Sequence, residues 1–166
     1  WKSDGTTSGT VMVKDIMPGP DPSYPMYLTY SNDFIFFSAN DGVYGVELWK
    51  SNGTTEGTEI VANIQWDINS SSPNNLTSVG EVLYFTANDE ETGYELWMSN
   101  GTEYGTMLVK DINPGTSSSS PKNMININGS LYFAADDGTN GNELWKSNGT
   151  SYGTFMLKDI GSGIAS

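Results

Sequence analysis

The sequence contains neither cysteine nor histidine, and all seven of its basic residues are lysine. Without cysteine the chain forms no disulfides and offers no thiolate nucleophile. Without either residue it cannot build the common tetrahedral zinc sites or a histidine-based catalytic dyad or triad. Small secreted domains often depend on disulfides, so the stability of this chain must come from packing.

Positive charge is scarce as well. The chain carries 20 acidic residues against 7 basic ones, which gives a formal net charge of −13. Such a surface repels the phosphates of nucleic acids and has no cationic patch that would release counterions. Nucleic acid is therefore not expected as a partner, and divalent cations suit the charge better.

Long apolar runs are also missing. Apolar residues make up 36 % of the chain, which is enough for the core of one ordinary domain. The longest runs span only a few residues, as at 34–37, whereas a membrane helix needs about 20. The sequence therefore predicts no insertion into a membrane.

What the chain does contain is a repeat of 48 residues. Tryptophans recur at this spacing, and a Gly-Thr pair begins four residues after each of them: Trp1, Trp49, Trp97 and Trp145. A second Gly-Thr pair and an isoleucine keep the same register without insertion or deletion. This regularity indicates one structural unit repeated along the chain. We expect the four tryptophans to pack in the core between units rather than to form a sugar-stacking surface.

Each unit reads as four short strands. In the second unit, residues 82–87 alternate with the period of a half-buried strand. Comparable segments lie at 75–79, 94–98 and 106–112, and Asn-Gly at 100–101 suits a tight hairpin. No stretch combines helical periodicity with capping residues. The predicted fold class is all-β, with tandem four-stranded antiparallel units of 48 residues.

The connections favour units arranged as the blades of a β-propeller. Three tight connections followed by a long Gly/Pro/Ser loop, such as 113–120, are typical of blades. A β-solenoid is the alternative, although its coils are usually shorter. We expect residues 1–24 to end a preceding unit with its fourth strand, and units to span 25–72, 73–120 and 121–166. Closed propellers need about four to eight blades, so this segment is expected to belong to a partial propeller or an open repeat array.

The motif around each tryptophan resembles a known repeat family. The run Glu47–Ser51 (ELWKS), with Gly-Thr pairs at 53–54 and 57–58, resembles the ELWxxDGT repeat. Residues 83–87 and 109–115 around the next tryptophan are similar to that family too, so the resemblance covers essentially the whole chain. It implies large secreted or surface-displayed repeat proteins with a propeller-like fold. It implies no characterised enzymatic activity, and so it transfers no catalytic residue.

Asparagine replaces the aspartate of that family's turn in three units. Asp4 keeps the acidic residue, whereas Asn52, Asn100 and Asn148 create Asn-Gly-Thr, an acceptor sequon for N-glycosylation. Three further sequons begin at Asn69, Asn75 and Asn128. The alternative is that asparagine simply serves the turn as aspartate does. We expect N-linked glycans at some of these six positions, which implies an extracellular or cell-surface protein.

Acidic residues recur in every unit, which argues against catalysis. Glu47, Glu95 and Glu143 each precede a Leu-Trp pair, yet a general acid or base is needed only once per site. No isolated acidic pair of the kind that glycosidases use interrupts the repeat. We expect these glutamates to form local bonds or to face solvent.

The loop at 136–143 is the best candidate for a metal site. Calcium takes six to eight oxygen ligands from flexible loops of this kind. The candidate ligands are Asp136, Asp137, Asn140 and Glu143. Their spacing does not fit an EF-hand, and a solvated turn is the alternative. No cofactor is expected to be required, with calcium the one metal that the sequence suggests.

These observations favour a non-enzymatic structural module of an extracellular, glycosylated repeat protein, such as a filament, a surface coat or an adhesive fibre. Its partners would be neighbouring copies of itself or further repeats of a longer chain, since repeat units bury their faces against neighbours. The alternative is a propeller that binds carbohydrates or another ligand multivalently, as a lectin or an adhesin does.

Overall fold

The computed structural model describes residues 1–66 and 68–161. Within these ranges the chain forms twelve β-strands in three antiparallel sheets of four, and each sheet follows the order of the sequence. The described residues contain no helix that could cross a membrane. The predicted all-β class with tandem four-stranded sheets is confirmed. The sheets do not close into a ring within the described ranges, and residues 162–166 of the predicted third unit lie outside them.

Each sheet lies within one of the predicted units, and equivalent strands recur 48 residues apart. The first sheet consists of β1 (Met26–Ser31), β2 (Phe34–Asn40), β3 (Val46–Ser51) and β4 (Thr58–Ala62). The second consists of β5 (Asn74–Val79), β6 (Val82–Asn88), β7 (Tyr94–Ser99) and β8 (Met107–Lys110). The third consists of β9 (Lys122–Ile127), β10 (Ser130–Asp136), β11 (Asn142–Ser147) and β12 (Phe155–Lys158).

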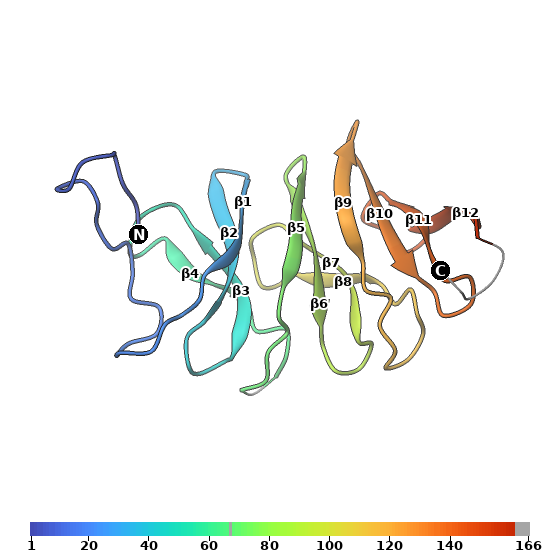
Figure 1. Ribbon diagram of the computed structural model, residues 1–166, viewed down its shortest axis with the longest axis horizontal. Helices are drawn as coiled ribbons and strands as arrows, with labels where there is room; N and C mark the ends of the chain where they lie inside the picture. Colours follow the sequence, from blue (N-terminus) through green and yellow to red (C-terminus); the bar gives the residue numbers. More distant parts are fainter. Residues whose placement is uncertain (67, 162–166) are drawn as a thin grey trace.

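The sheets stand side by side in a row from the N-terminal to the C-terminal end (Figure 1). Their first strands lie against one another, β1 against β5 and β5 against β9. At the first of these contacts the hydroxyl of Ser78 donates a hydrogen bond to that of Ser31 at 2.9 Å. The middle sheet therefore has a neighbour on each of its faces.

Apolar side chains from facing sheets fill the space between them. Phe36 and Leu48 of the first sheet belong to one cluster with Leu83 and Phe85 of the second, and none of the four is more than 3 % exposed. At the next junction Leu96 takes the place of Leu48 and is fully buried. Trp97 and Trp145 lie in these two clusters, and Trp49 lies in a third cluster with Phe37, Ala39 and Ile16. All three tryptophans are at most 9 % exposed.

The N-terminal segment departs from the predicted fourth strand. Only one bridge forms there, between Lys2 and Val11, with two N–H to O=C bonds of 2.9 Å. Trp1 is 81 % exposed, so the prediction that it lies in the core is wrong for this residue. Among the described residues no strands equivalent to β1 and β2 lie beside this segment, so it has no sheet to join.

Truncating Leu96 should cost far more stability than truncating its counterpart one unit later. Leu96 is fully buried, whereas Leu144 at the same position of the third sheet is 43 % exposed. Removing a buried leucine side chain costs about 2 to 5 kcal/mol, and an exposed one under about 1 kcal/mol. Urea unfolding of Leu96→Ala and Leu144→Ala, monitored by tryptophan fluorescence, measures the loss of unfolding free energy in each variant. Equal losses would contradict this difference in packing.

Candidate functional site: the junctions between sheets

A glutamate on the third strand of each sheet holds the loop that leads into the next unit. In the first sheet, Glu47 accepts hydrogen bonds from the backbone N–H of Ile64 at 3.1 Å and of Ser71 at 2.9 Å. The hydroxyl of Ser71 donates a further bond to the same carboxylate at 2.5 Å. This one side chain therefore joins the end of the fourth strand to the residues just before the next sheet begins.

The other two units repeat this arrangement. Glu95 accepts bonds from the N–H of Ile112 at 2.9 Å and of Ser119 at 2.7 Å. Glu143 accepts one from the N–H of Ile160 at 3.1 Å. All three glutamates are at most 5 % exposed. They form local bonds, as the sequence suggested, and they do not face solvent.

Two of these glutamates have strongly altered acidity. Burial raises the pKa of Glu47 and of Glu95 from about 4.5 to about 7, although the hydrogen bonds from Ser71 and Ser119 oppose this shift. A carboxylate without a cationic partner loses solvation that hydrogen bonds replace only in part. Both groups therefore titrate near neutral pH in the folded chain and near pH 4.5 in the unfolded chain.

Lysines join neighbouring sheets through backbone carbonyls. The ammonium of Lys50 donates to the carbonyl of Gly101 in the next unit at 2.9 Å and lies 3.1 Å from the carboxylate of Glu59. Lys2 makes the equivalent bond to Gly53, also at 2.9 Å. Sequence reasoning missed this role because the recurrence of lysine does not identify a carbonyl 51 residues away as its partner.

Other lysines lie in the fourth strand of a unit or at the equivalent position. Lys110 donates to the carbonyl of Thr154 at 2.8 Å, and its ammonium lies 5.6 Å from the centre of the Trp145 ring. A cation over an aromatic face at this distance is attracted by the ring quadrupole. Each contact crosses from one unit to the next, so the lysines add polar links to the apolar junction.

The Asn-Gly-Thr motifs form the turns between the third and fourth strands. Asn52 Oδ1 accepts bonds from the N–H and the hydroxyl of Thr54, at 3.0 and 2.8 Å. Asp4 makes the same two bonds to Thr6, at 2.9 and 2.7 Å. A Cβ at Gly57 would lie 2.0 Å from Asn52 Oδ1, which explains the second glycine of the motif. Asparagine and aspartate are thus equivalent acceptors in this turn.

The six sequon asparagines are all exposed: Asn52, Asn69, Asn75, Asn100, Asn128 and Asn148. They differ in how their side-chain amides are used. The Nδ2 of Asn75 donates to Asn74 Oδ1 at 2.6 Å and to the carbonyl of Pro121 at 3.2 Å. A glycan at Asn75 would therefore compete with a contact between the second and third units. In the described part of the chain, the side chains of the three turn asparagines accept hydrogen bonds through Oδ1 only.

The predicted calcium ligands are not assembled into one site. Asp136 accepts the N–H of Gly138 at 2.8 Å, and Asp137 accepts the N–H of Asn140 at 2.7 Å and its side-chain amide at 2.8 Å. Glu143 is directed elsewhere, to the end of the fourth strand. Across residues 1–66 and 68–161 no group of three acidic side chains is placed to hold a metal. These carboxylates are instead occupied by N–H donors.

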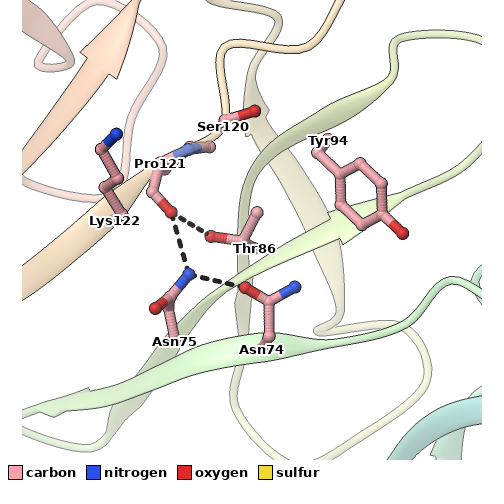
Figure 2. A pocket seen from close by; sticks show the side chains of 7 residues that line it. All are labelled: Asn74, Asn75, Thr86, Tyr94, Ser120, Pro121 and Lys122. Atoms are coloured by element: carbon pink, nitrogen blue, oxygen red, sulfur yellow. Dashed lines mark hydrogen bonds between the residues drawn. The ribbon is translucent and has the colours of Figure 1, made fainter. Parts of the chain in front are cut away.

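A cavity of about 280 Å³ lies where the second and third units meet. Figure 2 shows its lining residues, Asn74, Asn75, Thr86, Tyr94, Ser120, Pro121 and Lys122. The hydroxyl of Thr86 donates to the carbonyl of Pro121 at 2.6 Å. At the preceding junction Met26 and Tyr27 stand at the positions of the two asparagines. The two asparagines are therefore not a repeated feature of the units.

The raised pKa of the buried glutamates predicts an unusual pH dependence. Between about pH 4.5 and 7 the folded chain holds protons that the unfolded chain has released, so the free energy of unfolding falls as pH rises through this window. We expect about 1 to 3 kcal/mol per glutamate.

Urea unfolding at several pH values measures this loss, with the double variant Glu47→Gln/Glu95→Gln as the control. The variant should lack most of the fall that the original chain shows between pH 5 and 7. Identical pH profiles for the two proteins would contradict the assignment.

Comparisons with known proteins identify no family for this chain. No family model matches the chain, and no curated protein matches it. Among solved structures, the chain is similar to the computationally designed Ika8 protein, with 14% sequence identity and a TM-score of 0.47. The match covers 92% of this chain and 41% of that protein, so this chain spans about two-fifths of its length.

Proposed function

We propose that this chain is a non-enzymatic structural module of an extracellular repeat protein, a filament, a surface coat or an adhesive fibre, built from propeller-like blades. One observation carries this proposal: the polar side chains that recur along the chain hold units together. The buried glutamates bind the loops between units, and lysines reach carbonyls of the next unit. Because these glutamates and lysines are already bonded at the junctions, they favour a role in stacking units over a role in catalysis.

The exposed turns support the extracellular part of the proposal. Asn52, Asn100 and Asn148 occupy the same turn in successive units and are exposed. Glycans attached there would repeat at the spacing of the units. The acidic surface, with a net charge of −13, would add to their solvation.

A carbohydrate-binding module is the second candidate. The cavity of Figure 2 favours it, because the amides of Asn74 and Asn75 lie beside the hydroxyl of Thr86 there. Such groups fix the orientation of a polar ligand. The preceding junction has Met26 and Tyr27 in place of the two asparagines, which argues against multivalent binding, so we rank the structural module first.

The proposal is tested on protein secreted from a eukaryotic host. We expect particles larger than the 18.0 kDa chain in analytical ultracentrifugation, and a loss of mass on treatment with an N-glycosidase. The matched control replaces Asn52, Asn100 and Asn148 by aspartate, which keeps the turn as Asp4 does but removes the attachment site. An 18.0 kDa monomer at every concentration, with no change in mass, would contradict the proposal.

A further inference from the structure

Two loops of the first unit carry exposed apolar side chains that the repeat does not require. The loop between β2 and β3 contributes Val43 and Tyr44, which are 58 % and 42 % exposed. The loop that follows β4 contributes Trp66 and Ile68, which are 84 % and 78 % exposed. Of the five tryptophans in the chain, only Trp66 lies outside the 48-residue spacing. We call these four residues the loop patch.

Other units have polar residues or proline at the positions of the loop patch. The counterparts in the second unit are Glu91, Thr92, Pro114 and Thr116. In the N-terminal segment both positions of the second loop are proline, at Pro18 and Pro20. The repeated fold therefore does not need apolar side chains here. A group of exposed apolar side chains that the fold does not need indicates a surface that something else covers.

The two loops lie against each other, so the loop patch is one surface. A Cβ at Gly45 would lie 2.8 Å from the carbonyl oxygen of Ile68 and 2.7 Å from that of Asn69. The N–H of Val46 donates to the hydroxyl of Ser70 at 2.9 Å. Both loops lie along the lower edge of the row of sheets in Figure 1.

A neighbouring unit would not cover the loop patch. The second sheet has a neighbour on each face, yet three of the four counterparts in its unit remain exposed: Glu91, Pro114 and Thr116. These positions therefore lie outside the junctions, whatever stands before the first sheet. The group that covers the loop patch must have another source.

A sequon that also departs from the repeat lies within the same loops. Asn69 is exposed, directly follows Ile68 and begins the sequon Asn-Ser-Ser. Its counterparts in the other units are Asp21, Ser117 and Ala165, so no other unit has a sequon at this place. Among the described residues the Asn69 side chain has no hydrogen-bond partner, whereas the Nδ2 of Asn75 donates to two acceptors. Two departures from the repeat, one apolar and one a sequon, thus coincide.

We propose that the first sugars of an N-linked glycan on Asn69 cover the loop patch. The attachment forms a bond from Asn69 Nδ2 to the anomeric carbon of an N-acetylhexosamine. The bond from that carbon to its lipid-linked pyrophosphate donor breaks, and one amide proton leaves Nδ2. The inference rests on the proposed function, because it requires the glycosylation that the proposed function includes.

The chemistry of such a sugar fits the loop patch. One face of its ring presents C–H groups, and its acetyl group ends in a methyl, so both are apolar. The rings of Trp66 and Tyr44 offer large and rigid apolar surfaces against which these groups can pack. The hydroxyls of the sugar remain in water, and the glycan removes the apolar side chains from solvent without a partner protein.

Release of glycans from the folded, secreted protein tests this contact. The protein is treated with an N-glycosidase under native conditions, and the occupancy of each sequon is followed by mass spectrometry of its peptides. The glycan on Asn52, in a turn of the same unit, is the internal reference. We expect the glycan on Asn69 to be released at least about tenfold more slowly, because the enzyme must wait for the packed sugars to come away from the loops.

Variants that copy the second unit remove the loop patch while keeping residues that the fold accepts. In Trp66→Pro/Ile68→Thr the glycan on Asn69 should be released as fast as that on Asn52. Tyr44→Thr changes the other loop, introduces no proline and should lose part of the protection. The control Tyr104→Ser removes an aromatic side chain that is 95 % exposed elsewhere and should leave the protection unchanged. Protection that survives both patch variants, or that the control also loses, would overturn the inference.

The outcomes separate the inference from the proposed function. If no sequon carries a glycan, the inference and the extracellular part of the proposed function are both wrong. If the turn sequons are occupied but Asn69 is not, or if its glycan is released as fast as theirs, only the inference is wrong, and the loop patch is left for a partner protein. Slow release that the patch variants lose and the control keeps would support the contact.

Discussion

Each sheet of this protein has apolar side chains on both faces, and only a neighbouring sheet can remove them from water. Leu48 and Leu96 are fully buried because a following sheet covers them, while Leu144 remains 43 % exposed. Trp49 is 5 % exposed because its own sheet and Ile16 cover it, whereas Trp1 is 81 % exposed. Burial of apolar surface contributes about 25 cal/mol per Å². A single unit therefore lacks most of the stabilisation that the row provides.

The polar residues of the junctions follow from this arrangement. A loop that passes between two sheets carries N–H groups that lose contact with water, and each must find an acceptor. Glu47 supplies one for Ile64 and Ser71, and the lysines supply donors for carbonyls of the next unit. The burial that makes these bonds useful also raises the pKa of the carboxylates to about 7. Burial at the junctions therefore accounts both for the hydrogen bonds of the glutamates and for their raised pKa.

The sequence predicted the strands and their repetition well, because alternation and strict spacing are local signals. Residues 82–87 were expected as a strand and lie in β6. The partners of Glu47 and Lys50 could not be predicted, since they depend on how one unit rests on the next. The bonds of the predicted calcium ligands could not be predicted either: Asp136 and Asp137 accept nearby N–H groups, which spacing alone does not reveal. Trp1 follows the repeat in sequence but has no sheet around it.

Amide hydrogen exchange in the folded chain tests the central claim most directly, because it reports the local stability of each sheet. If neighbouring sheets provide the stability, the amides of β6 and β7 exchange most slowly, those of β11 and β12 faster, and those of residues 1–24 fastest. If the second and third sheets exchange at the same rate, or the third more slowly, then each unit is stable by itself. That result would contradict the dependence of each sheet on its neighbours.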